Sequence, residues 1–309
     1  MSRASRLLLP LASLVLATVG RASGAEPDRP HEAAGGRHCM GEARSKLLLS
    51  NGLYAQTNPL GLQDQLEYAG CLPLVRRPGP LFAYTNLQAG LVVNATPVYV
   101  TPGAFVSAAP LSVLELRAEA AAVRAWSIGS DGSGYFPRSG PDEQFQRLPG
   151  ALARSAKGAT ATLTATLRAR FELLRSWSIV AVDSYAHAYW RLGDAPWYYN
   201  PRHDLVMARR DWVGRNTAAL LLERELSERL TVRAGATDEL TWLPRSGYRA
   251  NILAGLFSAQ LSRWPGAWGE TQAFVRIGAY TEHAFRTGQL QTLAGIAVTF
   301  DVTPGHHLR

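Results

Sequence analysis

From Leu81 onward, apolar and polar residues alternate along the chain with a period of two. In the clearest run, 160–174, one face carries Ala, Leu and Phe and the other carries Thr, Arg and Glu. A helix would spread these apolar residues around its circumference, whereas a strand sorts them onto one face. The run also exceeds the roughly five or six residues of a common soluble strand and suits a tilted membrane strand.

The same alternation predicts further strands along the rest of the chain. Together with 160–174, ten are expected, the others at 81–93, 97–108, 111–124, 177–190, 216–227, 230–240, 250–262, 270–282 and 289–302. An earlier pair, 44–56 and 62–72, adds two more, joined by the turn Asn58-Pro59-Leu60-Gly61. The fold class is therefore all-β, an antiparallel transmembrane β-barrel of about twelve strands. Pro102 donates no ladder hydrogen bond, so a bulge or break is expected in 97–108.

The connections between these strands alternate in length. Short turns are expected near Pro110, 175–176, 227–229 and 264–269, and longer ones at 125–158, 191–215, 241–249 and 283–288. Short periplasmic turns alternating with longer outer loops are typical of bacterial outer-membrane barrels. Counted back from the last strand, these short turns fall on the side of the C-terminus, and an even strand number leaves the N-terminus there as well.

The first residues have the order of a secretory signal peptide. Arg3 and Arg6 precede an apolar stretch, 7–19, and small residues follow up to Ala25. We therefore predict a signal peptide over 1–25, a periplasmic lead-in over 26–43, an outer-membrane barrel over 44–302 and a periplasmic tail over 303–309. Beyond the signal, no apolar run is long enough for a transmembrane helix.

Alternation alone does not separate a membrane barrel from a soluble one, because a soluble barrel hides its apolar face inside. Two observations favour the membrane. All eight Trp residues lie at proposed strand ends or in connections, where aromatic girdles are expected. The polar face also mixes acids and bases within the strands, as expected of a lumen. The residues predicted to line it are Glu115, Arg117, Glu119, Arg168, Arg170, Glu172, Glu223, Glu225, Arg233 and Arg276.

With the signal peptide, the segments 81–119 and 183–256 resemble uncharacterised outer-membrane β-barrel proteins of Gram-negative bacteria. The resemblance lies in architecture and pattern, and no motif of known chemistry comes with it. It implies location in the cell outer membrane, contact with outer-membrane lipid and insertion by the barrel-assembly machinery. Such barrels often end on an aromatic residue, and here Phe300 lies in the last strand with nine residues after it.

Few residues suggest chemistry. Cys39 and Cys71 both fall on the periplasmic side and are expected to form a disulfide or to stay unpaired; two cysteines do not make a zinc site, and no metal or cofactor is expected. Asp183 and His187 share the polar face of 177–190 and are weak candidates for a lipid hydrolase. They lie about 13 Å apart along the strand, so His187 is expected to be a polar lumen residue rather than a catalyst.

Three functions remain open from the sequence. The first is a narrow porin-like pore, or a barrel that binds small solutes, with a lumen lined by Glu and Arg. The second is an outer-membrane lipid-modifying hydrolase. The third is a structural or surface-binding barrel using the loop 191–215, or a soluble exported β-protein. Although the formal charge is +8, the Arg residues are scattered rather than gathered, which argues against nucleic-acid binding.

Overall fold

The computed structural model describes residues 45–74, 81–82, 85–128, 133–140, 155–174, 176–262 and 270–303. The predicted signal peptide and lead-in lie outside these residues, as does the tail from residue 304 onward. Their boundaries therefore stay predictions. No helix in the described part of the chain is long and apolar enough to cross a membrane.

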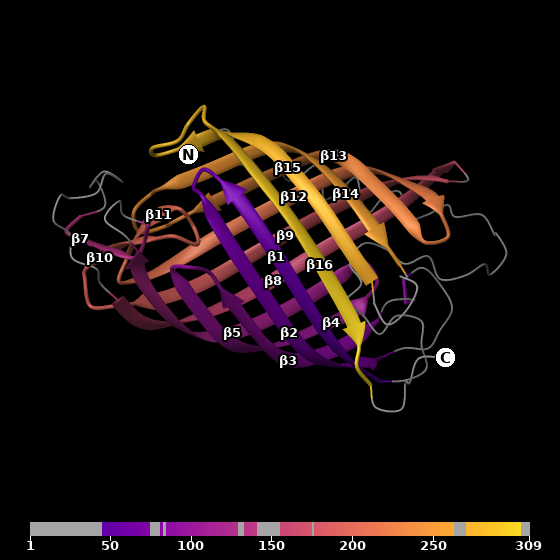
Figure 1. Ribbon diagram of the computed structural model, residues 1–309, viewed down its shortest axis with the longest axis horizontal. Helices are drawn as coiled ribbons and strands as arrows, with labels where there is room; N and C mark the ends of the chain where they lie inside the picture. Colours follow the sequence, from indigo (N-terminus) through magenta and orange to yellow (C-terminus); the bar gives the residue numbers. More distant parts are fainter. Residues whose placement is uncertain are drawn as a thin grey trace. The chain divides into compact units, whose positions relative to one another are not determined.

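Twelve antiparallel strands close into a barrel (Figure 1). Each pairs with its neighbours in chain order, and β1 pairs with β16 to complete the ring. The barrel strands are β1 (Lys46–Thr57), β2 (Gly61–Pro73), β3 (Asn86–Ala95), β4 (Tyr99–Leu111), β5 (Leu114–Ile128), β8 (Ser155–Leu174), β9 (Trp177–Leu192), β12 (Arg210–Ser227), β13 (Leu230–Trp242), β14 (Arg249–Leu261), β15 (Glu270–His283) and β16 (Leu290–Asp301). The predicted fold class and strand number are confirmed.

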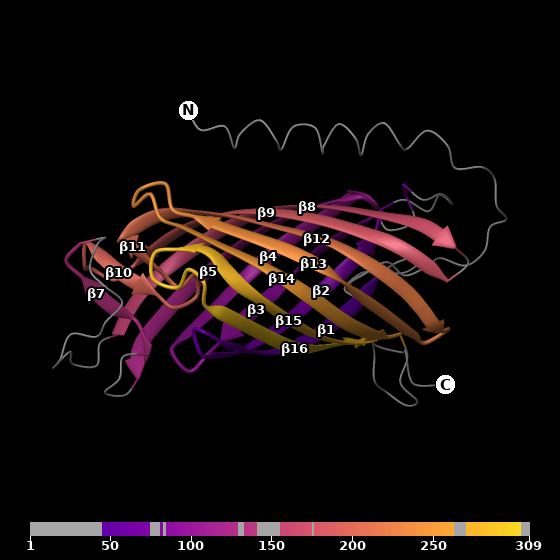
Figure 2. The same cartoon turned by 90° about the horizontal axis from the view of Figure 1, so that it is seen from above.

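Among the residues that the structure describes, four short strands lie outside the ring. β6 (Ser133–Gly134) pairs with the end of β5, while β7 (Phe136–Arg138), β10 (Trp197–Asn200) and β11 (Leu205–Ala208) form a separate sheet in the order β11-β10-β7. Figures 1 and 2 show this small sheet at the end of the barrel away from the last residues of β16. The hairpin formed by β10 and β11, residues 197–208, is called the mouth hairpin below.

The two faces of the barrel wall are those of a membrane protein. Large apolar side chains point outward and stay exposed, for example Leu163 at 65% and Leu220 at 60%. Charged side chains that alternate with such residues, including Glu223 and Arg233, are buried on the inward face. A soluble barrel would place its apolar side chains inside, so the outward apolar face marks the surface that contacts lipid.

One end of the barrel holds the tightest connections. Two residues each join β4 to β5, β8 to β9 and β12 to β13 at the end where β16 finishes. By the rule for bacterial barrels this is the periplasmic end, and the opposite end is the outer end. The predicted rhythm of connections fails in the first four strands. The short turns 58–60 and 96–98 lie at the outer end, whereas the longer connection 74–85 lies at the periplasmic end.

The expectation of a bulge or break at Pro102 holds only for one ladder, because the pairing with β5 is interrupted there while the strand itself continues. β4 runs without interruption, and Pro102 lies opposite Val93 of β3 with no shift of register. Thr101 and Pro102 are missing from the ladder with β5, which resumes in the same register at Gly103. The strand therefore tolerates the lost donor locally, and its register shifts only between Ala108 and Leu111, around Pro110.

Cys71 faces the lumen near the periplasmic end, where it packs against Leu48. It is disulfide-bonded. Cys39, the partner expected from the sequence, lies outside the described residues, so the Cys39–Cys71 pairing stays a prediction. Phe300 points outward opposite Leu49 of β1, on the lipid-facing side of the strand that closes the barrel.

Candidate functional site: the lumen and its outer mouth

The structure places all ten of the predicted lumen-lining residues on the inward face. Each lies next to an outward apolar residue in its strand, as Arg117 follows Leu116 and Arg276 precedes Ile277. Most are paired across strands, and only Glu172 and Glu225, near the periplasmic end, keep much of their surface exposed. Their charges are thus arranged in ion-pair groups, two beside one another in the periplasmic half of the wall and one closer to the outer end.

The first group joins β2, β4, β5 and β8. Arg117 lies 3.1 Å from carboxylate oxygens of both Glu67 and Glu119, and its guanidinium stacks 3.8 Å from the centre of the Phe105 ring. Beside it, Arg168 pairs with Glu115, which also accepts a hydrogen bond from the Ser107 hydroxyl. Glu67 belongs to this group although the sequence did not single it out.

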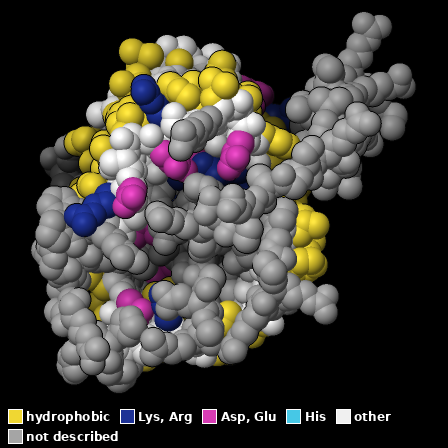
Figure 3. Space-filling model, turned by 90° about the vertical axis from the view of Figure 1, so that its right-hand side faces the viewer, with side chains coloured by type: hydrophobic (Ala, Val, Ile, Leu, Met, Phe, Trp, Pro, Cys, Tyr) yellow, Lys and Arg dark blue, Asp and Glu magenta, His cyan; other side chains and the backbone are white. Residues whose placement is uncertain are grey.

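The second group is centred on Glu223. One of its carboxylate oxygens accepts from Arg170 at 2.7 Å and the other from Arg233 at 2.6 Å. Arg170 also pairs with Glu225, and Arg233 donates to Gln260. Figure 3, which faces the periplasmic end, shows acidic and basic side chains gathered next to one another there.

The third group lies closer to the outer end and was missed by the sequence reasoning, apart from Arg276. Glu239 accepts from Arg276 at 2.7 Å and from Arg215 at 2.9 Å. Arg276 also donates to Gln291. The sequence did hold a signal for Glu239. It lies an even number of residues from Arg233 on β13, so both side chains point to the same side of the wall.

Above these groups, an apolar core fills the outer mouth. Inward residues of six barrel strands, such as Trp190 and Val213, pack with Tyr198, Leu205 and Met207 of the mouth hairpin. The three hairpin side chains have no exposed surface. The loop 191–215 therefore folds into the barrel and buries Tyr198 and Tyr199, while Trp197 stays partly exposed and Trp212 is on the outward face. Trp190 is 3% exposed and packs inside, so its placement in an outer aromatic girdle was wrong.

The tip of the mouth hairpin is held on the far side of the barrel. The hairpin leaves the wall between β9 and β12 and reaches the neighbourhood of β15, β16 and β1, which lie three to five places beyond β12 around the ring. There, Asp204 accepts from Arg286 of the β15–β16 turn and, at 2.7 Å, from the Tyr199 hydroxyl. Arg286 also donates to Asn58 of the β1–β2 turn. These contacts, called the tip latch below, hold the hairpin across the mouth.

His203 lies next to the latch, in surroundings that disfavour its charged form. Its Nε2 is buried with no hydrogen-bond partner among the described residues, and the ring lies edge-on to Trp190. Burial and the guanidinium groups of Arg202 and Arg215 hold the pKa of His203 well below its usual value. The ring therefore stays neutral while the hairpin is packed.

We expect acid to loosen the hairpin. When the hairpin leaves the mouth, the exposed His203 ring takes up a proton below about pH 6.5, whereas the packed ring stays neutral. The contribution of the neutral ring to the stability of the packed hairpin is therefore complete above that pH and is lost as the pH falls. Hydrogen–deuterium exchange of residues 197–208, corrected for the intrinsic effect of pH, should speed up between about pH 7.5 and about pH 5. A His203→Gln variant should lack this response, and an equal response in both proteins would contradict the prediction.

The two hydrolase candidates do not form a catalytic site. His187 lies opposite Leu163 and Asp183 opposite Leu167, two outward residues, so the expectation that His187 lines the lumen is wrong. The His187 ring stacks on Trp212 with 4.6 Å between ring centres, and Asp183 accepts a hydrogen bond from Asn216. Ser184 points inward and bonds to Thr166. Nucleophile, base and acid therefore do not converge.

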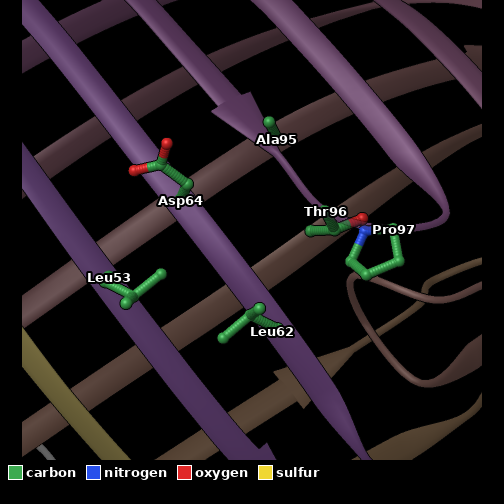
Figure 4. A pocket seen from close by; sticks show the side chains of 6 residues that line it. All are labelled: Leu53, Leu62, Asp64, Ala95, Thr96 and Pro97. Atoms are coloured by element: carbon green, nitrogen blue, oxygen red, sulfur yellow. The ribbon is translucent and has the colours of Figure 1, made fainter.

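A shallow hollow lies on the outward side of β1, β2 and the β3–β4 turn. Its volume is about 250 Å³, and Leu53, Leu62, Ala95 and Pro97 supply its apolar lining (Figure 4). Asp64 at its edge accepts a hydrogen bond from Asn51. It belongs to the lipid-facing surface rather than to the lumen. Among the described residues, no group of three or more His, Cys, Asp or Glu side chains is arranged to hold a metal ion.

Comparison with known proteins finds similar barrels but no family. No family model matches the chain, and no curated protein does. The β domain of the Bordetella autotransporter BrkA is 14% identical, with a TM-score of 0.45, over 83% of this chain and 98% of that one. The translocator domain of the autotransporter NalP from Neisseria meningitidis is 11% identical, with a TM-score of 0.39, over 96% and 95%. The KdgM porin is 12% identical, with a TM-score of 0.33, over 82% and 98%.

Proposed function

We propose that this outer-membrane β-barrel is a narrow pore for small polar solutes, constricted at its outer mouth by the mouth hairpin. The observation that carries the proposal is the inward surface itself. Three groups of cross-strand ion pairs line it, two in the periplasmic half of the barrel and one closer to the mouth. A barrel built only to anchor a surface loop needs no such lining, since an apolar interior would be at least as stable.

The lumen offers both donors and acceptors to a passing solute. Guanidinium and carboxylate groups stand next to one another in each group, so a polar solute can exchange hydrogen bonds with the wall as it moves. Twelve strands enclose a limited interior, and side chains take up much of it. The hairpin narrows the outer end further, because its buried residues join the wall in one apolar core. Conductance is accordingly expected to be small.

Recordings from planar bilayers test this proposal. The purified protein should give discrete, low conductance steps above the background of the lipid alone, because solvated ions can follow the charged lining. Heat-modifiable migration on gels identifies the folded barrel in the same preparation. If folded protein gives no conductance, and a variant without the mouth hairpin gives none either, the pore proposal is overturned.

A further inference from the structure

Four basic residues form a row on the outward face, at the outer ends of four neighbouring strands. They are Arg124 of β5, Lys157 of β8, Arg191 of β9 and Arg210 of β12, and all four are exposed. Arg124 lies directly opposite Lys157, and Arg191 directly opposite Arg210. Arg191 is opposite Ala159, so Lys157 is its diagonal neighbour. This set is called the cation row below.

The cation row is unfavourable in the isolated protein. Side chains directly opposite on neighbouring strands have Cβ atoms about 5 Å apart, and diagonal neighbours are about 7–8 Å apart, so like charges at these positions repel. Within the described residues, none of the four cations lies within 4.0 Å of a carboxylate oxygen. The charged groups of the lumen, by contrast, are matched with opposite charges. An external anion would remove this repulsion.

An aromatic patch fixes the level of the cation row in the membrane. Tyr189 of β9 and Trp212 of β12 lie opposite one another, with ring centres 5.1 Å apart. Each is two positions closer to the membrane centre than the basic residue of its strand, Arg191 or Arg210. Trp242 covers Gly214 on the same face, where a Cβ atom would collide with its indole ring. Aromatic belts of this kind lie at the lipid headgroups. The cation row, about 7 Å farther along the strands, therefore lies among the headgroups of the outer leaflet.

We propose that the cation row binds the phosphate groups of a phosphorylated lipid in the outer leaflet. Arg124, Arg191 and Arg210 each offer the planar fork of donors that fits phosphate oxygens, and Lys157 adds a point charge between them. Acyl chains of the same lipid would lie on the outward apolar residues below the patch, including Leu163 and Leu220. The site is formed by the wall alone and is independent of whether the lumen conducts.

The test uses the purified barrel in a zwitterionic detergent. It is titrated with lipid A carrying two phosphates, with the same lipid after both phosphates are removed, and with inorganic phosphate, and bound ligand is measured by native mass spectrometry. The variants are R191A/R210A, the charge-preserving R191K/R210K, and R224A/R229A. The last is a matched control that removes two cations from the opposite end, where Arg224 stacks outward on Trp177. Heat-modifiable migration verifies folding.

The native barrel should bind the phosphorylated lipid at least about tenfold more tightly than the dephosphorylated one, since each basic residue near an anionic surface contributes about a factor of five. R191A/R210A should lose this preference, while R191K/R210K and the control keep most of it. If the first variant does not fold, R124A/K157A tests the other half of the row. Equal binding of both lipids, no loss in the alanine variants, or saturation by inorganic phosphate at the same concentrations would overturn the proposal.

Discussion

Removing the mouth hairpin is expected to raise the conductance of the barrel several-fold while leaving the twelve strands intact. The ends of the segment already lie together, because the backbone N–H of Leu192 donates to the carbonyl of Arg209 at 3.2 Å. A two-residue Asn-Gly turn in place of residues 193–208 can therefore join β9 to β12 without strain. The change empties the mouth of Tyr198, Leu205 and Met207 and opens the charged lumen to the outside. Single-channel recording measures the difference.

Two further variants separate the hairpin from a general effect of shortening loops. Replacing residues 244–247 of the β13–β14 connection with a shorter turn trims a different outer loop and leaves the mouth hairpin in place. Conductance should then stay close to that of the native protein. Asp204→Ala removes the contacts of the tip latch to Arg286 and Tyr199, and should give intermittent openings to the larger conductance. If the deletion folds and conducts like the native protein, the hairpin is not the constriction.

The twelve strands were readable from the sequence because each wall strand meets two different environments. Lipid outside and charged partners inside select alternate residues, so from 160 to 173 β8 carries Ala, Leu and Phe on one face and Thr, Arg and Glu on the other. The same alternation identified the ten lumen-lining positions. It did not identify their partners, such as Glu67 and Arg215, because the pairs join strands that are distant in sequence or lie on the diagonal of the sheet.

The prediction failed on β9 for a physical reason. Its inward residues in the outer half, Ala188, Trp190 and Leu192, are apolar because they pack against the mouth hairpin. Its outward residues at the same level, including Tyr185 and His187, belong to the aromatic patch at the membrane surface. Inside and outside therefore exchange their usual polarity near the mouth. Alternation alone assigned the wrong side, because the hairpin is a tertiary feature that no local pattern encodes.

The largest loss of stability is expected for Glu223→Ala. Glu223 is 3% exposed and is the shared partner of Arg170 and of Arg233, which is 2% exposed. Without the carboxylate, Arg233 keeps only its hydrogen bond to Gln260, and its Nη2 is already buried without a partner among the described residues. Leaving a buried charge without its counter-charge costs about 3–5 kcal/mol. The free energy of unfolding, from reversible urea titrations in detergent micelles, should fall by that amount.

Glu225→Ala is the matched control, because it removes the same group two residues along the same strand. Glu225 also pairs with Arg170, at 2.9 Å, but its side chain is 36% exposed. Water replaces the carboxylate there, so the expected loss is below about 1 kcal/mol. A Glu223→Leu/Arg233→Leu double variant should regain most of the stability lost by Glu223→Ala, since it removes both buried charges together. Equal losses for Glu223→Ala and Glu225→Ala would mean that water reaches Arg233 and that the charged lining stays hydrated at this depth.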